Sequence, residues 1–121
     1  MALTASDTLV VCDGNNSQLR RLDPTNGNVT TIDLPIESSR GVTIGSDGTL
    51  YLADYGGLCE ISSDDALSRL ASNMPTFGLG DCLLNCCHLD EPSGLLYVAT
   101  ANQIYAVPIH TAGERRATRM F

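Results

Sequence analysis

The chain has 121 residues, the length of one ordinary domain, and 43% of them are hydrophobic, which is enough to build a packed core. Seven basic residues against 14 acidic ones give a formal net charge of -7. A chain with this charge lacks the cationic surface of proteins that bind nucleic acid or anionic membranes, so we expect no nucleic-acid partner.

One short apolar segment occurs three times, at intervals of about 40 to 50 residues. The copies are Thr8–Asp13, Thr49–Asp54 and Leu95–Thr100. Each copy is followed by two further short apolar segments, and the last two copies are also preceded by one. Four short strands in a repeat of this length are typical of a β-propeller blade. The sequence therefore predicts an all-β fold, a partial β-propeller of about three four-stranded antiparallel blades that form a single domain over residues 1–121.

The first blade is expected at about residues 1–34, and its innermost strand is cut short where the chain begins, which suggests a fragment of a longer protein. Its second strand, residues 8–13, is apolar on both faces, which indicates that both faces of the sheet are covered. Residues 14–17 suit a hairpin loop, because Gly and Asn tolerate positive φ. Asp-Pro-Thr-Asn-Gly at 23–27 then turns the chain into a strand at 29–32.

The second blade, at about residues 41–72, is the most regular, with hairpin turns at 46–48 and 54–57. The third blade is expected at about residues 79–121, and its first hairpin turn is Glu91-Pro92-Ser93-Gly94. Equivalent positions of a strand lie on equivalent faces, so one set of side chains should be buried in all three blades. This set consists of Leu9, Val11, Leu50, Leu52, Leu96 and Val98.

The five cysteines are expected to be thiols. Cys12 aligns with Ala53 and Ala99, which indicates a small core residue, and the adjacent Cys86 and Cys87 would point to opposite faces of a strand. No stretch approaches the roughly 20 apolar residues of a membrane helix, and the N-terminus lacks a basic region followed by an apolar run. These features favour a soluble protein of a reducing intracellular compartment, without a membrane span.

The densest cluster of ligand-type residues precedes the third copy and consists of Cys82, Cys86, Cys87 and His88. Zinc sites usually take their ligands from two separate pairs, and here a second pair is missing, since Cys59 and His110 are isolated. We interpret the cluster as small buried residues of the innermost strand of the third blade. Metal binding or redox chemistry at the cluster is the alternative.

Residues 47–56 read Asp-Gly-Thr-Leu-Tyr-Leu-Ala-Asp-Tyr-Gly, and residues 11–16 run on into Leu-Arg-Arg-Leu-Asp at 19–23. These stretches resemble the NHL-repeat pattern and its six-bladed propeller relatives. The chain departs from that pattern in having three blades, in lacking the Gly of the Asp-Gly turn in its first copy, and in carrying Ala101-Asn102 where the family has a longer loop. The resemblance implies the type of blade. We predict a non-catalytic NHL-like segment that acts as a protein–protein interaction scaffold within a larger assembly.

An enzyme is the alternative function. The gluconolactonase and strictosidine-synthase-like propellers resemble NHL propellers and hold a divalent metal in the central channel through Glu, Asn and Asp from several blades. The oxygen donors near the inner strand ends are explained more simply as turn residues, namely Asp47, Asp81, Asn85 and Asp90. Neither a Gly-x-Ser-x-Gly elbow nor a complete dinucleotide fingerprint is present. We therefore predict no catalytic, cofactor-binding or metal-binding residues and no cofactor, with a fragment of a metal-dependent propeller hydrolase as the alternative.

Three blades cannot close a propeller, because a closed ring uses about four to eight. Each flanking sheet would keep one bare apolar face, and exposed apolar patches mark interfaces. We expect these faces to be made by Leu9 and Val11 on one flank and by Leu96 and Val98 on the other. Further blades should cover them, from a second copy of the chain, from the remainder of a longer protein, or from another subunit.

Overall fold

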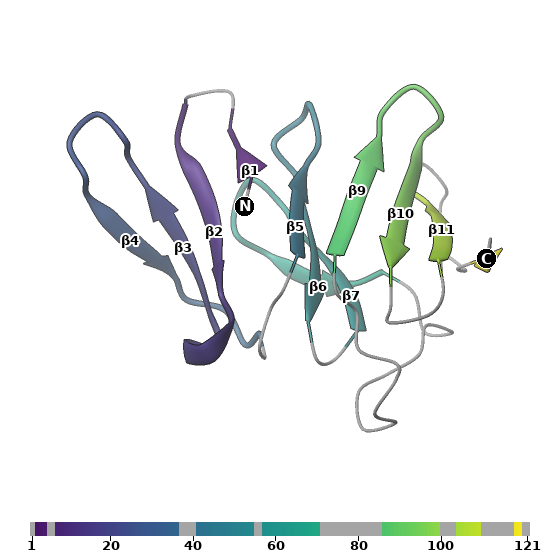
Figure 1. The fold of residues 1–121 in the computed structure, drawn as a ribbon, viewed down its shortest axis with the longest axis horizontal. Coiled ribbons are helices and arrows are strands. Elements are labelled where there is room, and N and C mark those ends of the chain that lie inside the picture. Colours follow the sequence, from purple (N-terminus) through teal and green to yellow (C-terminus); the bar gives the residue numbers. More distant parts are fainter. Residues whose placement is uncertain are drawn as a thin grey trace.

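A computed structural model of the protein describes residues 2–4, 7–36, 41–54, 57–70, 86–99, 104–109 and 118–119. These residues form three antiparallel four-stranded sheets, and one turn of 3-10 helix at Gly14–Asn16 is the one helical element among them (Figure 1). The all-β fold and the three four-stranded blades are as predicted. The chain is a partial β-propeller in which each sheet is one blade.

The strands of each sheet are hydrogen-bonded to one another in chain order. The first sheet contains β1 (Ala2–Leu3), β2 (Leu9–Asp13), β3 (Gln18–Leu22) and β4 (Val29–Ile32). The second contains β5 (Gly41–Ile44), β6 (Leu50–Asp54), β7 (Gly57–Ile61) and β8 (Leu67–Arg69). The third contains β9 (Cys86–Asp90), β10 (Leu95–Ala99), β11 (Ile104–Pro108) and β12 (Thr118–Arg119).

The hairpin between the first two strands of each sheet needs one residue with positive φ. Gly48 (φ 89°) and Gly94 (φ 67°) supply it in the second and third sheets, and Asp7 (φ 62°) takes the same place in the first. Asp tolerates the left-handed region better than most residues, because its short polar side chain can hydrogen-bond locally. The first sheet therefore keeps the turn although it lacks the glycine.

The pairing register places one row of apolar side chains on the same face of every sheet. The rows are Leu3, Leu9, Leu22 and Val29 in the first sheet, Ile44, Leu50, Ile61 and Leu67 in the second, and Leu89, Leu96 and Val107 in the third. Paired residues of antiparallel strands point to the same face, and successive residues alternate between faces. We call the face with this row the A face and the opposite face the B face. The B faces carry Val10 and Cys12, Tyr51 and Ala53, and Tyr97 and Ala99.

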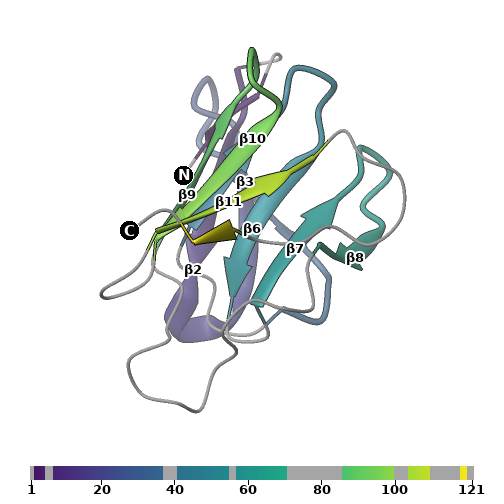
Figure 2. The same ribbon diagram turned by 90° about the vertical axis from the view of Figure 1, so that its right-hand side faces the viewer.

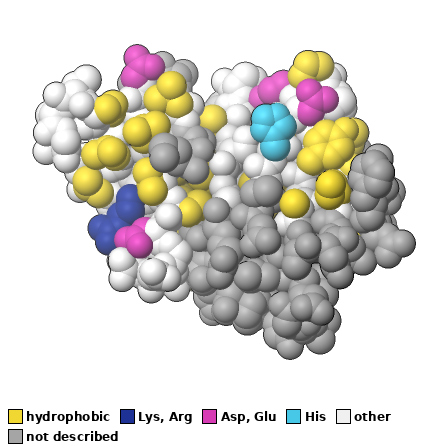
Figure 3. Space-filling view, viewed as in Figure 1, with side chains coloured by type: hydrophobic (Ala, Val, Ile, Leu, Met, Phe, Trp, Pro, Cys, Tyr) yellow, Lys and Arg dark blue, Asp and Glu magenta, His cyan; other side chains and the backbone are white. Residues whose placement is uncertain are grey.

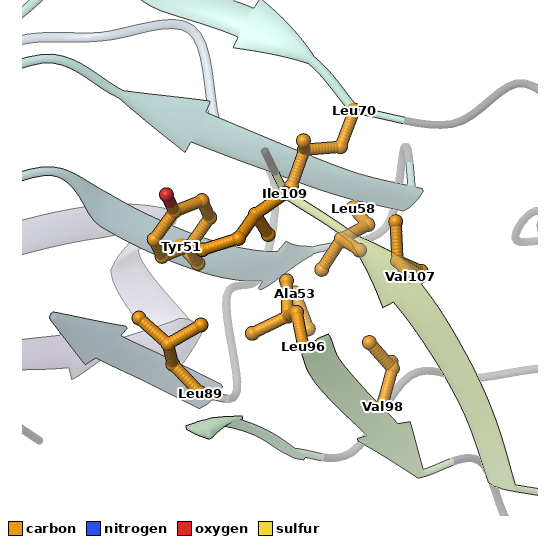
Figure 4. Packing of buried hydrophobic residues seen from close by; sticks show 9 residues of the cluster. All are labelled: Tyr51, Ala53, Leu58, Leu70, Leu89, Leu96, Val98, Val107 and Ile109. Atoms are coloured by element: carbon orange, nitrogen blue, oxygen red, sulfur yellow. The ribbon is translucent and has the colours of Figure 1, made fainter. Parts of the chain in front are cut away.

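The B faces of the first and second sheets pack against the A faces of the second and third sheets. The junction between the first and second sheets buries Val10, Leu19, Ile32, Ile36, Val42, Leu50, Leu52, Cys59 and Ile61. The junction between the second and third sheets buries Tyr51, Ala53, Leu58, Leu70, Leu89, Leu96, Val98, Val107 and Ile109 (Figure 4). Two separate cores of the same kind thus hold the three blades together.

The predicted set of buried residues is correct in two blades and wrong in one. Leu50, Leu52, Leu96 and Val98 are buried. In β2, Leu9 and Val11 are only half-buried, and Val10 between them is the buried residue. The reason is that the A face of the first sheet has no sheet against it among the described residues, whereas its B face packs on the second sheet.

The prediction for the open flanks needs a second correction. Leu96 and Val98 lie on the A face of the third sheet, against the second sheet, so they do not form an open surface. The open face of the third sheet is its B face, with Tyr97, Ala99 and Ile104. The strand β10 is apolar on both faces, and the stacking order of the blades decides which of the two is covered.

The three sheets are arranged as part of a ring. In Figure 1 the first sheet lies on the left and the third on the right, with β1, β5 and β9 nearest the middle. The innermost strand of the second sheet lies against those of both neighbours. Figure 2 shows that the second sheet extends from there away from the face seen in Figure 1, so that β8 lies on the far side. The A face of the first sheet and the B face of the third sheet, which turn away from the second sheet, are therefore on the same side of the molecule.

Candidate interaction surface

The A face of the first sheet is the first open surface. Its apolar row includes Leu3, which is 56% exposed, and Val29, which is 55% exposed, with Leu9 and Leu22 half-buried between them. These four side chains come from all four strands of the sheet, one from each. Figure 3 shows hydrophobic side chains gathered over β1, β2 and β3 on this side of the molecule.

Polar side chains occupy the other end of this face. Asp13 and Arg20 form an ion pair at 3.2 Å, and Nη1 of Arg20 donates a hydrogen bond to the hydroxyl of Thr31 at 3.1 Å. Both charged side chains are about one third exposed, so solvent screens the pair and its contribution to stability is small. The A face of the first sheet therefore has an apolar part next to the first hairpin and a charged part next to the 3-10 turn.

The B face of the third sheet is the second open surface. Ile104 is 38% exposed, and Tyr97 and Ala99 beside it are half-buried. His88 pairs with Tyr97 and is exposed on the same face. Figure 3 shows a second group of hydrophobic side chains on the right of the same view, beside a histidine. Ile104 was not singled out from the sequence, although its alignment with Leu19 and Leu58 is a signal that could have identified it.

The predicted cysteine cluster is divided by the alternation of side chains in β9. The Sγ of Cys87 points into the junction with the second sheet and donates a hydrogen bond to the carbonyl oxygen of Tyr51 at 3.4 Å. His88 points to the opposite face, and Cys82 and the side chain of Cys86 lie outside the described residues. Within the described residues, no three His, Cys, Asp or Glu side chains are close enough to hold a metal ion.

The cysteines whose side chains are described are thiols. They are Cys12, Cys59 and Cys87. Cys59 is fully buried in the junction between the first and second sheets, and its Sγ donates to the carbonyl oxygen of Leu52 at 3.7 Å. These three side chains fill core positions, as small apolar residues would.

The predicted oxygen donors that the structure describes act within their own turns. Oδ1 of Asp47 accepts a hydrogen bond from the backbone N–H of Thr49 at 3.0 Å. Oδ2 of Asp90 accepts from the hydroxyl of Ser93 at 2.6 Å. Asp81 and Asn85 lie outside the described residues. Both described carboxylates thus stabilise hairpin turns, which agrees with the simpler of the two interpretations.

Polar contacts at the junctions were not predicted from the sequence. Arg21 on the B face of the first sheet forms an ion pair with Asp65 in the turn after β7, at 2.7 Å. Oε1 of Glu91 accepts a hydrogen bond from the backbone N–H of Ser46 at 2.6 Å and so connects the first hairpins of the second and third sheets. The sequence signal for the first contact is the charge of Arg21 on the same strand face as the apolar Leu19.

A cleft of about 630 Å³ opens between the first and second sheets, next to these contacts. Its lining combines aliphatic side chains with hydroxyl and charged groups, among them Leu3, Arg21, Ile44, Ser62 and Glu91. The cleft adjoins the open A face, because both include Leu3. Among the described residues there is no helix long and apolar enough to cross a membrane.

No protein-family model matches the chain, and no curated protein matches its sequence. Solved structures do match its fold. A suggested gluconolactonase is 20% identical with a TM-score of 0.74, and the match covers 96% of this chain and 46% of that one. Virginiamycin B lyase from Staphylococcus aureus is 14% identical with a TM-score of 0.71, over 98% of this chain and 39% of the lyase.

The extracellular domain of a suggested one component system from B. thetaiotaomicron is 20% identical with a TM-score of 0.72, and the match covers 100% of this chain and 17% of that one. The chain thus spans less than half the length of each of these structures. They are propeller-type proteins of different kinds, and likeness at this level of identity concerns the fold. The comparison agrees with the stacking of the sheets in showing that the chain has the fold of a partial β-propeller.

Proposed function

We propose that the chain is a non-catalytic, NHL-like propeller segment that acts as a protein–protein interaction scaffold within a larger assembly. One observation carries the proposal. The large hydrophobic side chains that are exposed among the described residues are Leu3, Val29 and Ile104, and all three lie on the two sheet faces that no neighbouring sheet covers. An apolar surface at the positions where propeller blades stack is suited to binding protein.

The free energy gained by burying these side chains shows how much of each face a partner must cover. Burying one fully exposed Leu, Val or Ile side chain contributes about 1.5–3 kcal/mol, and because Leu3, Val29 and Ile104 are 56%, 55% and 38% exposed, covering the rest of the three contributes roughly 2 to 4 kcal/mol together. Association itself costs about 4–15 kcal/mol in lost translational and rotational freedom. Covering these three side chains alone would therefore leave little net affinity. A stable partner must also bury the half-exposed residues between them, such as Leu9 and Leu22.

Co-purification with matched variants tests this function. The bait is the chain as it stands, the variant is Val29→Asp combined with Ile104→Asp, and the control is Thr30→Asp. Thr30 is exposed and adjacent to Val29 in β4, but its side chain points to the opposite face of the sheet. We expect the wild type and the control to retain the same protein chains and the open-face variant to lose them. Retention of the same chains by all three baits would contradict the proposal.

A fragment of a metal-dependent propeller hydrolase is the second candidate. It is favoured by the likeness to the suggested gluconolactonase over 96% of the chain. The candidate predicts Ca²⁺ binding that is weakened by Asp47→Asn or Asp90→Asn, because carboxylate oxygens are the ligands that Ca²⁺ prefers. Calorimetric titration of the chain with CaCl₂ separates the two functions. Binding that both substitutions weaken would favour the hydrolase, and the absence of heat in all three proteins would favour the scaffold.

A further inference from the structure

We propose that the partner on the open faces is a second copy of this chain, and that two copies form a closed ring of six blades with two-fold symmetry. This inference rests on the proposed function, because it names the protein that covers the two faces. Each contact in the ring would be the same as the contacts that already hold the three sheets together.

The A faces provide the first argument. The row Leu3, Leu9, Leu22 and Val29 occupies the same register as Ile44, Leu50, Ile61 and Leu67 in the second sheet. In the second sheet, Leu50 and Ile61 are buried against the first sheet, and Ile44 and Leu67 pack against the same core. The third sheet buries its row in the same way. The first sheet has the residues of a junction, and within the described part of the chain no sheet covers them.

The B faces provide the second argument. Each B face pairs a small residue of one strand with an aliphatic residue of the next, in the pairs Cys12 and Leu19, Ala53 and Leu58, and Ala99 and Ile104. Leu19 and Leu58 are 0% exposed because the following sheet covers them, whereas Ile104 is 38% exposed. The third sheet therefore ends in an uncovered copy of the surface that the first two sheets use to bind their neighbours.

The two open faces are of opposite kinds. Among the described residues, both junctions join a B face to an A face, which leaves one open A face and one open B face. The open B face of one copy can thus form a third junction of this type with the open A face of another. Ile104 would then enter one core with Leu9 and Leu22, as Leu19 shares a core with Leu50 and Ile61.

The direction of the faces determines the form of the assembly. Both open faces are on the side of the molecule seen in Figures 1 and 3, with β1, β5 and β9 between them. A single second copy can therefore meet both faces at once. The copies would be related by a two-fold axis that passes between the innermost strands, and each would supply one A face and one B face. Closure favours this pair over a filament, because the second contact forms within an existing complex at high effective concentration.

The mass of the protein in solution tests the proposal. We expect sedimentation equilibrium at micromolar concentration to give one species of twice the 12.9 kDa chain mass. Leu9→Lys and Ile104→Glu should each give monomers, since either one places a charge in both junctions of the dimer. The double variant that carries both substitutions should associate more strongly than either single variant, because opposite charges then meet at each junction, and more weakly than the wild type, because burying the pair costs desolvation free energy. Thr30→Glu, on the other face of β4, should leave the dimer unchanged.

Several results would overturn the proposal. They are a wild type that is monomeric, a wild type that forms a series of larger oligomers or aggregates, and Leu9→Lys and Ile104→Glu variants that both remain dimeric. The mass of the wild type decides the matter even if a variant fails to fold. A monomeric wild type that still retains other protein chains in the co-purification would overturn the pairing and leave the scaffold function in place. A monomeric wild type that retains none would overturn both.

Discussion

The second sheet and the two flanking sheets have the same strand pattern but different environments. The second sheet is covered on both faces, whereas the first and third are each covered on one. Leu58 and Ile104 occupy equivalent positions, and the first is fully buried while the second is not. The comparison shows that the repeat determines which residues form a strand, and that the position of the blade in the stack determines which of them are buried.

The largest expected effect on stability comes from truncating the equivalent residues Leu58 and Ile104. Leu58→Ala should lower the free energy of unfolding by about 2–5 kcal/mol, because it leaves a cavity in a covered core. Ile104→Ala should cost about 1 kcal/mol or less in a single chain, since its side chain is partly in water. Urea unfolding of both variants in the Leu9→Lys background, which is monomeric under the proposed pairing, measures the two losses. Equal losses would show that the third sheet is covered in a way that the structure does not contain.

The positive-φ residues of the first hairpins, Asp7 and Gly48, allow a second comparison between the first and second sheets. A Cβ added at Gly48 would meet the Cβ of Ser63 at 3.8 Å, an ordinary contact, so the cost of Gly48→Ala comes from its φ of 89° and should be about 1 kcal/mol. Asp7→Gly, at the equivalent turn, should change stability by less than about 0.5 kcal/mol, because Asp already tolerates this conformation. Thermal unfolding measures both effects. A larger effect at Asp7 than at Gly48 would contradict the equivalence of the two turns.

The two ion pairs of the first sheet, one on each face, should differ less in their contributions to stability. Arg21 binds Asp65 through two hydrogen bonds across a junction, whereas Arg20 binds Asp13 within the open face. Both pairs are partly exposed, so each should contribute only about 0.2–1 kcal/mol, with the larger value for the two-bond pair. Double-mutant cycles with Arg→Met and Asp→Asn substitutions at low salt measure these energies. A larger coupling energy for Arg20 and Asp13 would indicate that solvent screens the open face less than its exposure implies.

The smallest expected effect concerns the turns after the third strand of each sheet. The hydroxyl of Thr25 donates to Asp23 at 2.6 Å and, with the N–H of Thr25, lowers the pKa of this carboxyl group. Because the pKa is lower in the folded state, the stabilisation is present above the unfolded pKa and is lost as pH falls through the folded value. At the equivalent turn of the second sheet, the hydroxyl oxygen of Ser62 accepts a hydrogen bond from the backbone N–H of Ala66, and this group does not titrate in this range.

Replacing Thr25 with Val should therefore raise the pKa of Asp23 toward its ordinary value. Carboxyl chemical shifts followed through an NMR titration measure this change. Because the backbone N–H of Thr25 still donates to Asp23 in the variant, part of the shift should remain. An unchanged pKa would show that the Thr25 hydroxyl does not lower it.

Much of the fold could be predicted because the repeat supplies the same information three times. Turn residues separate the strands, and the alternation of side chains fixes the register within each blade. The open faces could not be predicted correctly, because a strand that is apolar on both sides has the same sequence whether one or two neighbours cover it. Leu96 and Val98 were therefore assigned to the wrong surface, although they were correctly expected to be buried.

The candidate surface was predictable in kind and not in detail. That each flanking sheet has one open face follows from the number of blades. The role of Ile104 depends on its pairing with Ala99, and the exposure of Val29 depends on its position in the outermost strand of an uncovered face. Both are properties of the stacked sheets and become visible only when the register and the order of the blades are known.

The repeated junction has a consequence for the evolution of the chain. Because every blade offers one A face and one B face, a duplicated coding segment for a single blade would produce a unit that fits both of its new neighbours without further substitution. Growth or loss of blades then alters the curvature of the ring and leaves the side chains at each contact unchanged. In such a lineage, selection on new surface loops could proceed while the apolar positions remained fixed by stacking.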